Sequence, residues 1–216
     1  MSRKPKSGSW GAGGASVAER PELAVKIAIV ANNWSTIEGH MAYALGAMIG
    51  TDHRVALAIL GKVQTATAKS QMIRAIGKTA LDERIQPELF ELLKKFDDLA
   101  PRRNKVIHGL WGTMSSEPDG LIWVPANAST RISLGLVAAM RDQTVDELFH
   151  SVMSEVELWE SADFDALNAE LDHLAGESVA FAAKMQGLAT AKALGADKLE
   201  SILAKLHGTS AGPDTA

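Results

Sequence analysis

The feature that most constrains the fold is a run of apolar residues at steps of three and four near the start of the chain. This spacing matches the 3.6-residue period of an amphipathic helix. Gly50 follows the run and is a residue type that commonly ends helices. The residues of the run are Leu23, Ile27, Val30, Trp34, Ile37, Met41, Leu45 and Met48. The pattern predicts a first helix of about seven turns.

Helical spacing continues after this run. We expect a second helix from about Arg54 to Gly77 and a third that begins near Pro87. Because Pro101 has no backbone N–H, we expect the third helix to stop, kink or restart there. PRRNKVIH would then be a short helix that starts at the proline, with Gly109 placed for a left-handed cap. The residues expected to face inward in the second helix are Val55, Ile59, Val63, Ala66, Ile73 and Ile76.

Residues 110–135 break the helical pattern. The sequence SSEPDG is typical of a turn, and the short apolar runs LIWVPA and RISLGL either pair as strands or form a loop. TVDE at 144–147 fits a capping box at the start of a helix that includes Trp159, and two more helices are expected from about Phe164 to Gly187 and from about Ala189 to Leu206. The predicted fold is an all-α antiparallel helical bundle with an irregular loop or short hairpin after residue 109.

The two ends of the chain differ in composition from the rest. Residues 1–20 are rich in Gly, Ser, Lys and Arg and are expected to form a disordered arm, as residues 208–216 are to form a disordered tail. Residues 21–207 are expected to form a single helical domain. With no uninterrupted apolar run of eighteen residues and no signal peptide, we expect a soluble cytoplasmic protein without a membrane span.

Charge is distributed unevenly along the chain. Residues 50–110 carry eleven Lys/Arg against seven Asp/Glu, whereas residues 111–216 carry six against sixteen. Ten of these acids lie between Thr144 and Glu177, where Lys and Arg are absent. The ordinary interpretation of such a run is a solvated helix face. A polyanion would therefore be expected to bind the middle of the chain, residues 50–110, where basic residues outnumber acidic ones.

The sequence predicts no metal site and no cofactor. The chain has no cysteine, and its six histidines form neither a His-x3-His pair nor a His-Glu-x-x-His motif. IGKT at 76–79 resembles the end of a phosphate-binding loop, but Met72 stands where that loop requires glycine.

The segment RRNKVIHGLWG, residues 102–112, carries the main candidate chemistry. Asn104 and His108 are four residues apart and would share a helix face. Arg103 continues the apolar stripe of Phe96 and Leu99, so it would point inward toward an anionic or hydrogen-bonding partner. Arginine can bind a phosphodiester with two hydrogen bonds, and histidine can transfer a proton near neutral pH. The alternative is that both side chains only satisfy carbonyls near a kinked helix end.

These residues resemble a known family. Arg103 to His108 match the Arg-x4-His motif of HEPN domains, and Trp111 completes an RNxxxHG.W pattern seen in uncharacterised bacterial helical proteins. WSTIEGHM in the first helix, with Trp34 and Glu38, is similar to the helix that accompanies this pattern. The resemblance covers about residues 22–185 in architecture, although only about ten residues carry it specifically.

HEPN domains are helical bundles, and many are metal-independent endoribonucleases that dimerise so that two motifs line one cleft. The resemblance implies that Arg103 binds phosphate, His108 transfers protons and Asn104 supports them. Trp34, Glu38 and Trp111 would support the site, with Glu38 pairing with Arg103 or orienting His108. The residues expected to contact RNA are Lys105, Arg102 and Lys94.

The resemblance therefore predicts a homodimeric ribonuclease acting on RNA, related to toxin or defence systems. An alternative is a non-catalytic HEPN-like module that binds a protein, such as an antitoxin, or a nucleotide. A third interpretation is a structural helical protein whose acidic segment docks a basic partner.

Overall fold

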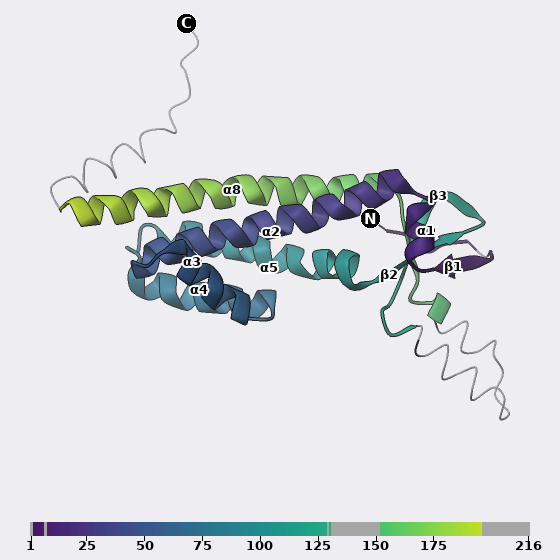
Figure 1. The fold of residues 1–216 in the computed structure, drawn as a ribbon, viewed down its shortest axis with the longest axis horizontal. Coiled ribbons are helices and arrows are strands. Elements are labelled where there is room, and N and C mark those ends of the chain that lie inside the picture. Colours follow the sequence, from purple (N-terminus) through teal and green to yellow (C-terminus); the bar gives the residue numbers. More distant parts are fainter. Residues whose placement is uncertain (1, 7, 129, 131–151, 196–216) are drawn as a thin grey trace, which may run out of the picture. The chain divides into compact units, whose positions relative to one another are not determined.

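The computed structural model describes residues 2–6, 8–128, 130 and 152–195. The protein is mostly helical with a small four-stranded antiparallel sheet, so its class is α+β and the all-α prediction is wrong in this respect. Most of the elements are labelled in Figure 1. They are β1 Trp10–Ala12, α1 Gly14–Ala18, α2 Pro21–Ile49, α3 His53–Lys62, α4 Ala66–Ala80, α5 Gln86–His108, β2 Leu110–Met114, β3 Glu117–Val124, β4 Glu157–Trp159 and α8 Ser161–Leu194.

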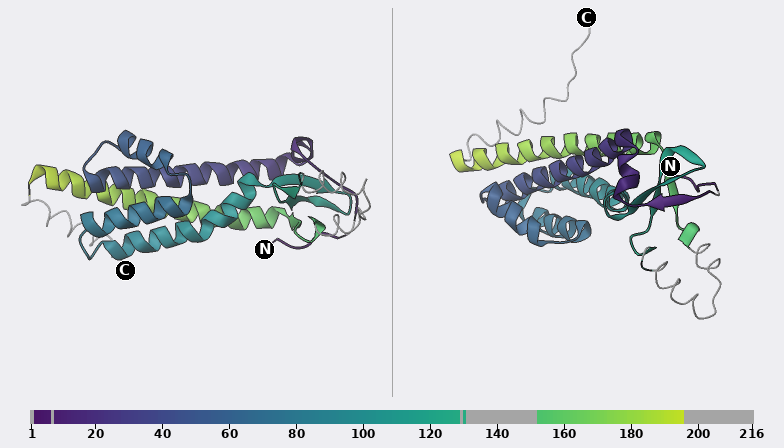
Figure 2. Two further views of the ribbon diagram at one scale, coloured as in Figure 1. Left: turned by 90° about the horizontal axis from the view of Figure 1, so that it is seen from below. Right: turned by 45° about the vertical axis from the view of Figure 1, so that its right-hand side comes forward.

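The chain forms two compact units, and the single domain expected over residues 21–207 stays a prediction. Unit 1 consists of Met1–Asn32 and Pro101–Leu171, and unit 2 of Asn33–Ala100 and Asp172–Ala216. The unit boundaries fall inside α2, α5 and α8, which Figure 2 shows as unbroken helices. Unit 1 contains the sheet and the motif segment, and unit 2 contains α3 and α4.

Helix α2 confirms the prediction made from the apolar run. It ends at Ile49, and Gly50 follows with a φ of 67°, in the left-handed region that favours glycine. In unit 2, the Trp34 ring stacks on Phe96 with ring centroids 4.4 Å apart, and both side chains are buried. The 3.6-residue period therefore located the buried face of this helix.

The single helix expected from Arg54 to Gly77 is instead two helices, α3 and α4. Thr65 starts α4, because its side chain accepts a hydrogen bond from Ala68 N at 3.1 Å. Val55 and Ile59, expected to face inward, are 49% and 41% exposed, and the buried residues of α3 are Ala56 and Leu60.

Two further helix boundaries differ from the prediction. Pro101 lies inside α5, so the short helix expected to restart at the proline does not exist as a separate element. Helix α8 is continuous where two helices were expected, and Gly187 lies in its interior. Trp159, expected in a helix, lies in β4.

The sheet of unit 1 has the strand order β1-β2-β3-β4, with antiparallel neighbours. Ser115 and Ser116 connect β2 to β3 in a short hairpin after the motif helix, but its strands are not the expected pair, and Glu117 to Gly120, expected in a turn, lie in β3. RISLGL and TVDE lie outside the described residues. The apolar core against this sheet is formed by Met114, Ile122, Val124, Ala128, Val152, Val156 and Leu158.

The N-terminal arm, expected to be disordered, is paired with this sheet. Strand β1 pairs with β2, with Trp10 opposite Met114, and Arg3 forms an antiparallel bridge with Leu158. The strand partners of the arm lie a hundred residues or more away in sequence, so composition alone did not reveal them. The tail at 208–216 lies outside the described residues. None of the described helices is both long and apolar enough to cross a bilayer.

Candidate functional site

Two tryptophans from the hairpin hold the end of the motif helix. The last carbonyls of a helix lack intrahelical partners and need other donors. Trp111 Nε1 donates to the carbonyl oxygen of Val106 at 2.9 Å, and Trp123 Nε1 donates to that of Lys105 at 2.7 Å. Trp111, expected to support the site, therefore fixes the helix end from β2. Trp123 on β3 plays the same part, although no local sequence signal pointed to it.

Gly109 is required for a reason that the sequence did not suggest. Its backbone does not adopt the left-handed conformation that the prediction assigned to it. A Cβ at this position would lie 1.7 Å from Trp123 Nε1. Only glycine leaves room for the indole to reach the carbonyl of Lys105. The glycine and the tryptophan therefore form one structural device at the end of α5.

The three candidate catalytic residues lie on the last two turns of α5. Arg103 is half-buried, in keeping with its place on the apolar stripe, and its Nη1 donates to Asn104 Oδ1 at 3.0 Å. Asn104 and His108 are both exposed, one turn apart on the same face of the helix. The structure therefore brings Arg103 and Asn104 into contact and presents Asn104 and His108 to solvent. A guanidinium, an amide and an imidazole at one helix end can bind a phosphate and move a proton.

Arg102 and Lys105, expected to contact RNA, are held by carboxylates instead of lying free. Arg102 Nη1 is 2.6 Å from Glu170 Oε2, and Lys105 Nζ is 2.7 Å from Glu157 Oε1. Lys105 Nζ also lies 4.9 Å from the centre of the Trp123 ring. Both cations line a pocket of about 560 Å³ in unit 1, together with Ser2, Pro101, Trp159, Asp163, Ala166 and Glu170.

Glu157 stays ionised in this surrounding. Burial opposes its ionisation, but hydrogen bonds from Lys105 and from Ser2 outweigh burial and hold the pKa of this carboxyl below its ordinary value. The acidic run of the sequence, interpreted as a solvated face, thus supplies partners for the cations of the motif. The acidic run is visible in the sequence, but which cation each of its carboxylates pairs with can be read only from the fold.

Trp34 and Glu38 belong to unit 2 and form a cluster of their own. Trp34 Nε1 donates to Glu38 Oε1 at 2.9 Å, and Lys69 Nζ donates to the same oxygen at 2.7 Å. The side chain of Lys69 is only 14% exposed, so this ion pair is largely shielded from solvent. The sequence analysis expects Glu38 to pair with Arg103 or to orient His108; the hydrogen bonds that the structure gives its Oε1 come from Trp34 and from Lys69, which the sequence did not single out. Lys94, the third expected RNA contact, is exposed on α5 in the same unit.

The described residues include no group of three or more His, Asp or Glu side chains placed to hold a metal ion. The IGKT sequence lies inside α4, and the element directly before α4 is helix α3, whereas a nucleotide-binding loop follows a strand.

No protein-family model matches the chain, and neither a curated protein nor a solved structure was found to be similar to it. The similarity to HEPN domains stays a prediction from the motif residues.

Proposed function

We propose that the protein is a metal-independent endoribonuclease of the HEPN type, with Arg103, Asn104 and His108 as its site. The observation that carries the proposal is the hydrogen bond of 3.0 Å between Arg103 Nη1 and Asn104 Oδ1, one turn before the exposed His108. This contact joins the guanidinium to Asn104, which shares an exposed helix face with His108, on a helix end that two indoles hold in place.

The chemistry follows from the groups present. His108 takes the proton of a ribose 2′-hydroxyl, whose oxygen attacks the adjacent phosphorus. Arg103 donates hydrogen bonds to the non-bridging oxygens, where negative charge develops in the transition state. The bond to the 5′-oxygen breaks, that oxygen takes up a proton, and the products are a 2′,3′-cyclic phosphate and a 5′-hydroxyl. Asn104 orients the guanidinium.

Two proton transfers favour a site built from two copies of the chain. One neutral imidazole removes the proton of the nucleophile, and a second, protonated imidazole supplies the proton of the leaving oxygen. One copy contributes a single histidine to this site. A homodimer in which the two motifs face one another would provide both, so the proposal includes a dimer.

The direct test is cleavage of mixed RNA by the purified protein in the presence of EDTA. Arg103→Ala and His108→Ala are each expected to lower the cleavage rate by about 100-fold or more. Matched controls are Arg84→Ala and His173→Ala, because these side chains are 71% and 72% exposed and lie outside the site. The proposal is wrong if the wild type leaves RNA intact, or if the site variants cleave as well as the controls.

The second candidate function is a non-catalytic HEPN-like module, and the ion pairs of Arg102 and Lys105 favour it. A polyanion must displace Glu170 and Glu157 before it can use these two cations, and RNA binding needs local positive charge. If this function holds, His108→Ala binds a labelled oligonucleotide or partner protein as tightly as the wild type does. Neither the wild type nor the variant then cleaves RNA.

A further inference from the structure

The outer edge of β4 is covered by the chain's own N-terminal segment. Strand β4 is at one end of the sheet, so its outer N–H and C=O groups need partners. Arg3 N donates to the carbonyl oxygen of Leu158 at 3.1 Å, and Leu158 N donates to that of Arg3 at 2.7 Å. Arg3 thus pairs with Leu158 as a residue of an added strand would, within unit 1.

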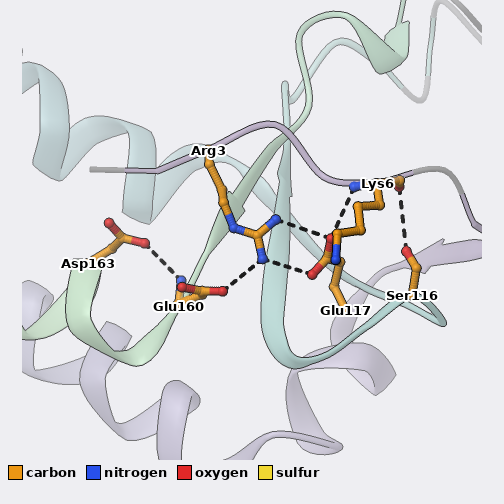
Figure 3. A network of polar contacts seen from close by, with 6 residues as sticks. All are labelled: Arg3, Lys6, Ser116, Glu117, Glu160 and Asp163. Carbon is orange, nitrogen blue, oxygen red and sulfur yellow. Dashed lines mark hydrogen bonds and ion pairs between the residues drawn. The ribbon is translucent and has the colours of Figure 1, made fainter.

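Arg3 occupies a site made of two carboxylates (Figure 3). Its Nη1 and Nη2 donate to the two oxygens of Glu117 at 3.2 and 2.9 Å, and Nη2 also donates to Glu160 Oε1 at 2.9 Å. Two parallel hydrogen bonds from a guanidinium to one carboxylate are stronger and more specific in geometry than a single ion pair. Lysine cannot make this contact with both carboxylate oxygens.

Glu117 makes this a specific site, because its buried carboxylate needs hydrogen-bond donors. The residue is only 7% exposed, and a buried carboxylate without a hydrogen-bonding partner is strongly unfavourable. Besides the guanidinium, the backbone N–H of Lys6 donates to Glu117 Oε1 at 3.0 Å. One arginine side chain and one backbone N–H of an extended segment therefore satisfy this carboxylate together.

Polar contacts hold the rest of the segment. Ser2 Oγ donates to Glu157 Oε2 at 2.8 Å, and Lys4 Nζ donates to the carbonyl oxygens of Val156, at 3.2 Å, and Ser154. The side chain of Arg3 remains 45% exposed. Contacts of this kind are weakened by salt and open more readily than an apolar interface.

We propose that the β4 edge, with Glu117 and Glu160, is a binding site for an extended basic peptide that contains arginine, and that residues 2–6 occupy it as an internal ligand. Peptides that add a strand to a sheet edge gain affinity from backbone hydrogen bonds and specificity from side-chain sites. Leu158 supplies the backbone partners here, and the two carboxylates select arginine. The seated segment, SRKPK, shows which ligand chemistry fits.

The proposal goes beyond the ribonuclease activity and is tested without it. The probe is a fluorescent SRKPK peptide, titrated by anisotropy into the full chain and into its Arg3→Ala variant. In the wild type the tethered segment competes at an effective concentration of the order of millimolar, so Arg3→Ala is expected to bind the peptide at least about tenfold more tightly. Adding Glu117→Gln to Arg3→Ala is expected to remove that gain, and raising the salt concentration is expected to weaken binding.

Two controls define the outcome. A peptide with its arginine replaced by alanine is expected not to bind, and Arg84→Ala, which leaves the segment intact, is expected to bind SRKPK as weakly as the wild type. The proposal is wrong if folded Arg3→Ala binds the peptide no better than the wild type, or if the alanine peptide binds equally well. If circular dichroism shows that Arg3→Ala is unfolded, Arg3→Lys replaces it under the same criteria. This variant keeps the positive charge but cannot make the two parallel hydrogen bonds to Glu117.

Discussion

Replacing Trp111 by phenylalanine removes the indole N–H that holds the end of α5 and keeps an aromatic ring in place. Trp111 is 7% exposed, and the carbonyl that it binds belongs to Val106, which is 1% exposed. A buried carbonyl that loses its donor costs about 1–3 kcal/mol. The substitution also removes part of a packed ring, which lowers stability by itself. A control must separate these two contributions.

Trp159 provides that control. It is 5% exposed and belongs to the same aromatic cluster, with ring centroids 5.8 Å from Trp111. Both rings contact Phe164, at 5.3 and 5.2 Å between centroids. Trp159 Nε1 donates to no helix carbonyl in the part of the chain that the structure describes. Trp159→Phe therefore loses the same ring volume and the same indole N–H without uncapping a helix carbonyl, so the difference between the two variants measures the cap.

We expect Trp111→Phe to be less stable than Trp159→Phe by about 1–3 kcal/mol. Urea denaturation followed by circular dichroism measures the free energy of unfolding of each variant at one pH. In thermal unfolding, the same difference corresponds to a shift of about 2–4 °C per kcal/mol for a chain of this size. If the two variants are equally stable, the indole does not hold the helix end, and our explanation of the motif geometry is refuted.

Three further predictions concern other positions. Gly109→Ala is expected to lower the melting temperature, because the new Cβ would overlap Trp123 Nε1; a melting temperature equal to that of the wild type would contradict this packing. Pro101→Ala is expected to raise stability by about 1–2 kcal/mol in urea denaturation, since proline inside a helix costs up to about 3 kcal/mol and part of this is offset in the unfolded chain. Hydrogen bonds from Arg3 hold the pKa of Glu117 below its ordinary 4.5, so this carboxylate stabilises the fold above that pH and loses its contribution as the pH falls below it. Urea midpoints measured over a series of pH values should therefore fall less steeply with acid in Glu117→Gln than in the wild type, and equal slopes would exclude this role.

The parts of the fold predicted from the sequence are those determined by local patterns. The apolar stripe of α2 and the stop at Gly50 are encoded within one helix, and both were found. The break before Thr65 was missed because the apolar residues on either side keep helical spacing across it. Trp159 was assigned to a helix because a strand of three residues has almost no period of its own. Its state depends on pairing with Leu121 in β3, which sequence spacing does not show.

In the candidate site, too, the features set by local sequence were predicted, and those that depend on distant residues were not. The shared face of Asn104 and His108 follows from helix geometry and is present in the structure. The ion pairs that neutralise Arg102 and Lys105 join residues 68 and 52 positions apart, so they could not be inferred from spacing. Gly109 was recognised as important, but for its backbone rather than for the indole that fills its side-chain space.

The measurement that tests the central claim most directly is the identity of the RNA ends left after incubation with the protein and EDTA. Mass spectrometry of a short synthetic RNA distinguishes a 2′,3′-cyclic phosphate from a 3′-hydroxyl or an open phosphate. We predict fragments with a cyclic phosphate and a 5′-hydroxyl from the wild type, and intact RNA from His108→Ala. Intact RNA with the wild type, or the same fragments from His108→Ala, would contradict the assignment of this site.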